Sequence, residues 1–135
     1  MSKSALVLTL FIAWALLLLV LMEIFRSHLV LTGRAKSNEF KPDNSNVSAF
    51  MQRLARAHAN CVESLPLFGG LLLVALVTGR TGATDPLAPW LLGARVVQSS
   101  IHLASTSIVA VNARFTAFMV QVAIAVYWVW VLLTS

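Results

Sequence analysis

The sequence predicts an all-α integral membrane protein that folds as a four-helix bundle. Of its 135 residues, 59% are apolar and only 11% are charged, whereas soluble domains carry about 25% charged residues. This balance excludes an ordinary soluble domain and a disordered tail. A chain this short cannot enclose so much apolar surface in a core surrounded by water, because small domains keep a large surface for their volume. We therefore expect a single domain over residues 1–135 whose apolar surface lies against membrane lipids.

Four apolar stretches, at 5–22, 61–78, 87–111 and 115–133, account for the expected helices. A spanning helix needs about 20 mostly apolar residues. With their polar flanks, we expect helices over about residues 4–31, 47–79, 87–110 and 113–134. The first stretch is also similar to the apolar part of a signal peptide. Because no small-residue cleavage site follows it, we expect this helix to be retained.

The distribution of positive charge predicts the orientation in the membrane. Most cations lie between the first two helices or just before the last one, on one side of the membrane. They are Arg26, Arg34, Lys36, Lys41, Arg53, Arg56 and Arg114. By the positive-inside rule the first loop is cytoplasmic and both termini are outside. We expect a multi-pass protein of a bacterial inner membrane or an organelle membrane.

Polar residues inside the expected helices recur at helical spacing. The stripes are Arg53, Arg56, Asn60 and Glu63, then Arg95, Gln98 and His102, then Arg114 and Gln121. At 3.6 residues per turn, each set shares one helix face. A charge at mid-bilayer costs about 2.5–3.5 kcal/mol, so such residues usually face the bundle interior and mark functional sites.

Counting along the helices places several of these groups at similar depth. We expect Glu23, Asn60, Glu63, His102 and Arg114 to converge in the cytoplasmic third of the bundle. Such a cluster suits a small zwitterionic or anionic ligand held by charge-assisted hydrogen bonds.

Purely structural interpretations stay open for the same residues. Glu63 could hold two helices together through an ion pair with Arg95 or Arg114. His102 could be a neutral core residue. Gln121 fits an interhelical hydrogen bond, and the loop cations fit contacts with lipid headgroups. The three histidines show no metal-ligand spacing, and no nucleic-acid motif is present, so neither a metal nor a nucleic-acid partner is expected.

Residues 56–68 read RAHANCVESLPLF. This run resembles the signature R-A-H-x-N-x-x-E-x-x-P-x-F of the MAPEG family, the membrane-associated proteins in eicosanoid and glutathione metabolism. Gly93-Ala94-Arg95 and Asn112-Ala113-Arg114 are also similar to segments of that family, in the manner of a microsomal glutathione transferase. The resemblance covers nearly the whole chain and is strongest over 53–68.

The resemblance implies a homotrimer of four-helix bundles that binds glutathione, as co-substrate, between adjacent subunits near the cytoplasmic face. It assigns Arg114 to stabilising the glutathione thiolate, since a nearby cation lowers the pKa of a thiol. The positions it assigns to glutathione binding are Arg56, Asn60, Glu63, Arg95 and, in the first loop, Arg34. Gln98 and His102, on the same helix face as Arg95, complete the candidate binding residues. Gln98 and His102 stand where several catalytic relatives have tyrosines or a histidine–tyrosine pair. The stretch from His102 to Arg114 is also longer than in well-known members.

Three functional hypotheses follow, and the sequence leaves open whether the protein is an enzyme. The first is a glutathione-dependent transferase or peroxidase acting on lipophilic small-molecule electrophiles. The alternative is a non-catalytic protein of the same fold that binds a lipid or a protein partner, which the missing tyrosines favour. A small transporter with Glu63 as proton carrier is a weaker third hypothesis, because neighbouring arginines would keep that carboxylate ionised.

Overall fold

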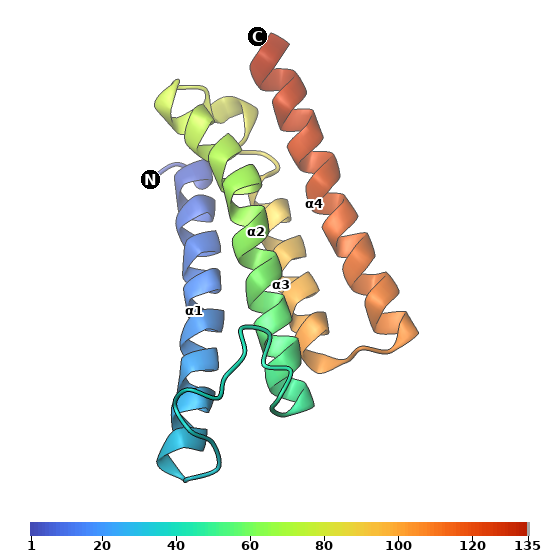
Figure 1. Ribbon diagram of the computed structural model, residues 1–135. Coiled ribbons are helices and arrows are strands. Elements are labelled where there is room, and N and C mark those ends of the chain that lie inside the picture. The colour runs from blue at the N-terminus through green and yellow to red at the C-terminus, as the bar shows by residue number, and fades with distance from the viewer. Residues whose placement is uncertain (135) are drawn as a thin grey trace.

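The computed structural model describes residues 1–134, and this part of the chain is entirely helical apart from turns and loops. Its elements are α1 (Lys3–Leu31), α2 (Ala49–Val77), the 3-10 helix η1 (Thr81–Ala83), α3 (Ala88–Ala104) and α4 (Ile108–Thr134). The four α-helices run along a common long axis, with both ends of the chain near η1 (Figure 1). The predicted all-α, four-helix architecture is confirmed.

Three of the helices are long and apolar enough to cross a membrane. α1 and α2 have 29 residues each and α4 has 27, so each extends about 40 Å at 1.5 Å per residue. That length exceeds the roughly 30 Å hydrocarbon core of a bilayer. α3 has only 17 residues, or about 25 Å, and packs against all three neighbours.

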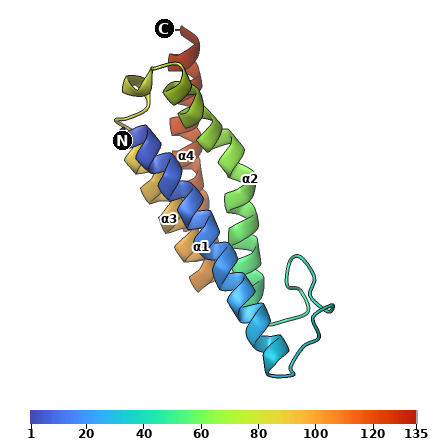
Figure 2. The same ribbon diagram turned by 90° about the vertical axis from the view of Figure 1, so that its left-hand side faces the viewer.

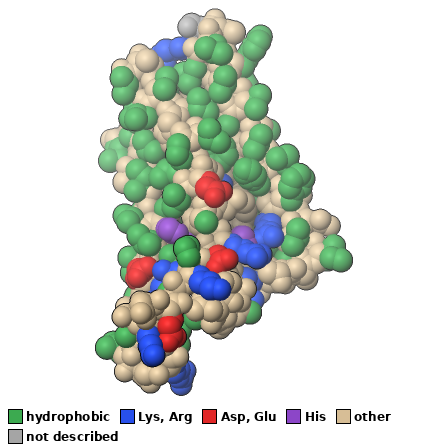
Figure 3. All heavy atoms as spheres, in the orientation of Figure 1, with side chains coloured by type: hydrophobic (Ala, Val, Ile, Leu, Met, Phe, Trp, Pro, Cys, Tyr) green, Lys and Arg blue, Asp and Glu red, His purple; other side chains and the backbone are tan. Residues whose placement is uncertain are grey.

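The core and the outer surface are both apolar, as expected for a bundle surrounded by lipid. Phe11, Leu54 and Trp128 are fully buried, whereas Leu16 and Leu67 are more than half exposed. Figure 3 shows hydrophobic side chains over most of one face, while basic side chains and histidines gather in its lower part. The polar part of the molecule is therefore concentrated at the end of the bundle opposite the termini.

The boundary between the last two helices differs from the expected one. α3 was expected to reach residue 110, but it ends at Ala104, and α4 begins at Ile108 instead of near 113. Ser105 is extended, and its Oγ accepts the N–H of Ser107 at 3.0 Å; Ser107 Oγ in turn accepts the N–H of Ala110 at 3.2 Å. Serine hydroxyls compete with helical hydrogen bonds and cap a new helix, so the chain reverses earlier than hydropathy alone predicts. The other helix boundaries lie within two residues of those expected.

The turn between α2 and α3 holds two helix ends. The Arg80 guanidinium donates to the carbonyls of Leu132 and Val131 at 2.7 and 2.9 Å, at the C-terminus of α4. Asp85 Oδ1 accepts the backbone N–H of Ser4 at 2.8 Å, at the N-terminus of α1. Both charges have the sign that stabilises the helix end they contact, and they fix the ends of α1 and α4 relative to the turn.

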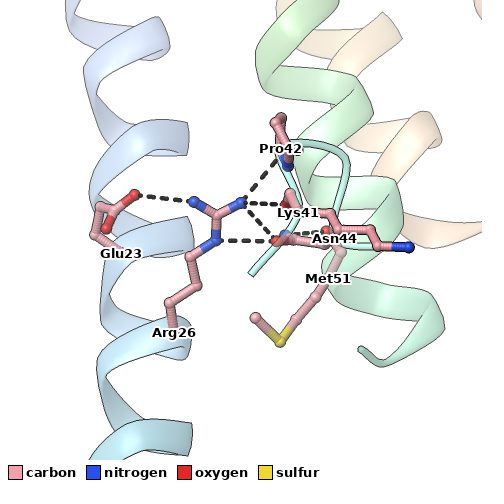
Figure 4. A network of polar contacts seen from close by, with 6 residues as sticks. All are labelled: Glu23, Arg26, Lys41, Pro42, Asn44 and Met51. Carbon is pink, nitrogen blue, oxygen red and sulfur yellow. Dashed lines mark hydrogen bonds and ion pairs between the residues drawn. The ribbon is translucent and has the colours of Figure 1, made fainter. Parts of the chain in front are cut away.

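The segment from 32 to 48 is organised by Arg26 on α1 (Figures 2 and 4). Arg26 Nε and Nη2 donate to Asn44 Oδ1 at 2.9 and 2.6 Å, and Asn44 Nδ2 donates to the carbonyl of Met51 at 2.8 Å. Asn44 is fully buried, with φ at 56°. Arg26 Nη1 also lies 3.6 Å from Glu23 Oε1. Arg26 therefore positions the loop, and contact of the loop cations with lipid headgroups stays a prediction.

Candidate functional site

A cavity of about 290 Å³ lies between the first turns of α2, the last turns of α3 and the first turns of α4. Its lining residues are Arg56, Asn60, Gln98, His102, Val111, Arg114, Phe115 and Phe118. These segments meet because successive helices alternate in direction, so that α2 begins, α3 ends and α4 begins at the same end of the bundle (Figure 1). The structure thus brings together five of the site residues proposed from the sequence.

Within residues 1–134, the ionisable side chains that line the cavity are all basic. Arg56 is exposed and Arg114 is half-buried, while His102 is buried; no carboxylate is among the lining residues. Arg114 Nη1 and His102 Nε2 are buried without a hydrogen-bond partner within residues 1–134. An unsatisfied buried polar group costs about 1–3 kcal/mol, so the cavity is suited to an anionic ligand that supplies the missing partners.

Arg114 lines the cavity despite the long stretch that separates it from His102. The break at 105–107 removes three residues from the helices and lets α4 fold back along α3, which it contacts extensively. An added helical turn would have displaced Arg114 by about 5 Å along the axis. The turn keeps both side chains at the same cavity.

Arg95 lies behind the cavity wall and does not line it. Its side chain is fully buried, and Nη1 donates to Asn60 Oδ1 at 2.6 Å. Its guanidinium carbon is 5.5 Å from the ring centre of Phe11 and 5.9 Å from those of Phe68 and Phe118. A guanidinium held by three aromatic rings and one amide is stabilised by cation–π contacts, so Arg95 supports Asn60 from the core.

Hydrogen bonds between amide side chains extend from Asn60 across the bundle. Gln98 Nε2 donates to Asn60 Oδ1 at 3.1 Å, and Gln121 Nε2 donates to Gln98 Oε1 at 2.8 Å. The interhelical hydrogen bond expected for Gln121 is therefore present. Gln121 is fully buried, so this chain of amides connects α2, α3 and α4 through the core.

Besides Arg95, three residues expected at the site do not line the cavity. Glu63 is exposed on α2, and the one ion pair within residues 1–134 joins Arg26 to Glu23, so the ion pairs expected for Glu63 within the chain are absent. Glu23 does not line the cavity and so does not join the expected cluster. Arg34 borders a separate hollow of about 240 Å³ at the end of α1.

The apolar part of the lining was missed by sequence reasoning. On α4, Phe115 lies one residue and Phe118 four residues after Arg114. Residues four apart share a helix face, so Phe118 is on the face that carries Arg114. That spacing is the signal that could have found Phe118. It gives the cavity an apolar wall beside its basic one.

The family model of the MAPEG family matches residues 4–134. The chain belongs to the MAPEG family. Membrane proteins of this family include glutathione transferases and related enzymes, so the resemblance found in the sequence is confirmed for nearly the whole chain. Neither the search of curated proteins nor the search of solved structures gave a match. The cavity of this MAPEG protein contains Arg56 and Asn60, which belong to the segment that resembles the family signature.

Proposed function

We propose that this protein is an integral membrane, glutathione-dependent transferase or peroxidase acting on lipophilic electrophiles. The observation that supports this function most directly is the basic cavity in which Arg56, His102 and Arg114 meet without a carboxylate. Glutathione is a tripeptide anion with two carboxylates, one ammonium group and a thiol. A cavity with two guanidinium groups and unpartnered buried polar atoms matches the acceptor groups of that molecule.

In this proposal Arg56 and Asn60 hold the peptide, and Arg114 faces the sulfur. Arginine stays protonated, and a cation beside a thiol lowers its pKa and raises the thiolate fraction at neutral pH. In the transferase reaction the thiolate attacks an electrophilic carbon, a C–S bond forms, and the leaving group departs with the electron pair. In the peroxidase reaction the thiolate attacks a peroxide oxygen and the O–O bond breaks. The alkoxide takes a proton, and a second glutathione reduces the sulfenic acid to glutathione disulfide and water.

The electrophile would enter from the bilayer. Val111, Phe115 and Phe118 form the apolar side of the cavity, and Phe115 is 60% exposed on the outside of the bundle. A lipophilic molecule dissolved in the membrane therefore has an apolar surface that leads to the position proposed for the sulfur. This arrangement supports a substrate of low polarity and does not select one chemical class of electrophile.

We also propose that the protein is a homotrimer with glutathione at the subunit interface. Glu63 is exposed on α2 beside Val62 and Leu67, which are 46% and 66% exposed. A carboxylate facing lipid at this depth would cost about 2.5–3.5 kcal/mol, so a neighbouring subunit is the more favourable surrounding. In such an assembly Glu63 would meet the ammonium group of glutathione bound by an adjacent chain.

The proposal also includes the orientation in the membrane, with the first loop cytoplasmic and both termini outside. The membrane is a bacterial inner membrane or an organelle membrane.

Turnover of an activated aryl halide by the purified protein in detergent, with glutathione, tests this function. We expect Arg114→Ala to fold and to lose about 100-fold in rate, as is typical when a group that stabilises developing charge is removed. Arg114→Lys should retain part of the activity, and Lys36→Ala, in the exposed loop, should match the unmodified protein. Undiminished turnover by Arg114→Ala would contradict the role given to Arg114.

The alternative function is a non-catalytic lipid- or partner-binding protein. It is favoured by Gln98 and His102, which stand where the resemblance places tyrosines or a histidine–tyrosine pair in several catalytic relatives. It is also favoured by the use of both ends of the Gln98 amide in contacts within the bundle. Absence of turnover with aryl halides and with lipid hydroperoxides, together with a lipid that co-purifies stoichiometrically, would support this function in place of the first.

A further inference from the structure

The amide groups of Asn60, Gln98 and Gln121 connect the core of α4 to the cavity wall. Gln121 does not line the cavity, whereas Gln98 and Asn60 do. Gln121 contacts Gln98 at 2.8 Å, and Gln98 contacts Asn60 at 3.1 Å. A residue outside the site is thus linked to a residue of the site through one intermediate side chain.

The partners at the two ends of this series of hydrogen bonds determine the orientation of every amide group in it. The guanidinium of Arg95 has only N–H donors, so the Asn60 atom 2.6 Å from its Nη1 has to be the acceptor Oδ1. The carbonyl of Ala117 only accepts, so the Gln121 atom 3.1 Å from it has to be Nε2. With both ends fixed, Gln98 satisfies its two neighbours only with Oε1 toward Gln121 and Nε2 toward Asn60.

This orientation occupies the acceptor capacity of Asn60. An amide oxygen has two lone pairs, and Asn60 Oδ1 receives hydrogen bonds from both Arg95 and Gln98. Within residues 1–134, Asn60 Nδ2 makes no hydrogen bond. Since Asn60 lines the cavity, the group it can offer to a ligand is its N–H, and not its carbonyl.

We propose that Gln121 and Gln98 are positioning residues that hold Asn60 as a hydrogen-bond donor toward the ligand. The cavity then accepts a carboxylate or carbonyl oxygen at this point and discriminates against an N–H group. The identification of this ligand as glutathione rests on the proposed function. Gln121 touches no ligand and acts through Gln98. With Arg56 and Arg114 as further donors, this part of the wall recognises acceptors.

Asn60→Asp tests the orientation of the amide. The variant keeps the size of the side chain, forms an ion pair with Arg95, and replaces the N–H toward the cavity by an oxygen. We expect a melting temperature at or above that of the unmodified protein and glutathione binding weakened at least about tenfold, as for a ligand acceptor that faces no donor. The matched control is Asn112→Asp, which places the same charge on the exposed face of α4. Undiminished affinity in Asn60→Asp would overturn the proposal.

A double-mutant cycle tests whether Gln121 acts through Gln98. We expect Gln121→Leu to weaken glutathione binding by about three- to tenfold, the effect of one lost hydrogen bond. The same substitution should have no further effect in a Gln98→Leu background, because coupled residues are not additive. Equal losses in both backgrounds would overturn the relay, whereas a general loss of fold would appear in the melting temperature.

A readout without ligand separates this inference from the proposed function. In the ligand-free protein, we expect Gln121→Leu to shift the side-chain amide resonances of Asn60 in nitrogen–proton correlation spectra. Unshifted resonances would overturn the relay whatever the ligand. Failure of the unmodified protein to bind glutathione, with the Asn60 resonances shifted as expected, would instead contradict the proposed function and leave the relay supported.

Discussion

Arg95 Nη1 lies 2.6 Å from Asn60 Oδ1, and this hydrogen bond joins the core of α3 to the wall of the cavity. Arg95 is fully buried, and its Nε and Nη2 have no hydrogen-bond partner within residues 1–134. Burying a guanidinium that makes only one hydrogen bond is costly even beside aromatic rings, so this arginine is retained at an energetic cost. The cost is consistent with a role in orienting Asn60.

Substitution of Arg95 separates stability from binding. We expect Arg95→Ala to destabilise the bundle by about 2–4 kcal/mol through the void left among the phenylalanines. Arg95→Met fills most of that space without a buried charge, so its stability should equal or exceed that of the unmodified protein. Both variants should bind glutathione more weakly, because Asn60 loses a contact. Thermal unfolding in detergent and a glutathione titration measure the two effects; strong destabilisation by Arg95→Met would contradict this account.

Asn44 holds the 32–48 segment through its side chain and its backbone. Its φ of 56° lies in the left-handed region, which costs a residue such as alanine about 1–2 kcal/mol. We expect both Asn44→Gly and Asn44→Ala to speed proteolysis of the segment, because both lose the hydrogen bonds to Arg26 and Met51. The alanine variant should be cleaved faster than the glycine variant. Equal cleavage of all three proteins would show that this contact does not organise the loop.

Arg80 is expected to stabilise the end of α4. Arg80→Ala removes the donors from the carbonyls of Val131 and Leu132, so amide hydrogen exchange in the last turn of α4 should accelerate about five- to tenfold, the effect of about 1 kcal/mol. Exchange near Arg114, at the other end of the helix, serves as the internal control. Uniform acceleration along α4 would indicate a global effect and contradict local capping.

Substitution of Glu63 tests the proposed homotrimer. If a neighbouring subunit covers this carboxylate, Glu63→Gln should preserve the trimer while weakening glutathione binding about tenfold through loss of a charge-assisted hydrogen bond. Native mass spectrometry gives the oligomeric state of each protein, and calorimetry gives the affinity. A monomeric unmodified protein, or unchanged affinity in the variant, would argue against a site completed between subunits.

Much of the fold could be predicted because hydropathy and helical spacing act over many residues. The boundary between α3 and α4 could not, since it depends on hydroxyl capping by Ser105 and Ser107. Local hydrogen bonds of this kind shift a helix end by several residues without changing the average hydropathy.

The site was predictable where spacing determined the helix face. Arg56 and Asn60 reach the cavity together, as their stripe implies. Glu63 shares that face but does not line the cavity, because periodicity gives the direction of a side chain and not where the neighbouring helices close the space. Glu23 pairs with Arg26 three residues away on its own helix, a local contact of the kind that neighbouring charges on a helix readily form.

The central claim is that the basic cavity binds glutathione as a thiolate. The most direct measurement is a titration of the purified protein with glutathione at neutral pH, following the ultraviolet absorbance of the bound thiolate. We expect a saturable signal in the unmodified protein and in Lys36→Ala, and its loss in Arg114→Ala. A flat titration, or a signal that persists in Arg114→Ala, would contradict the account.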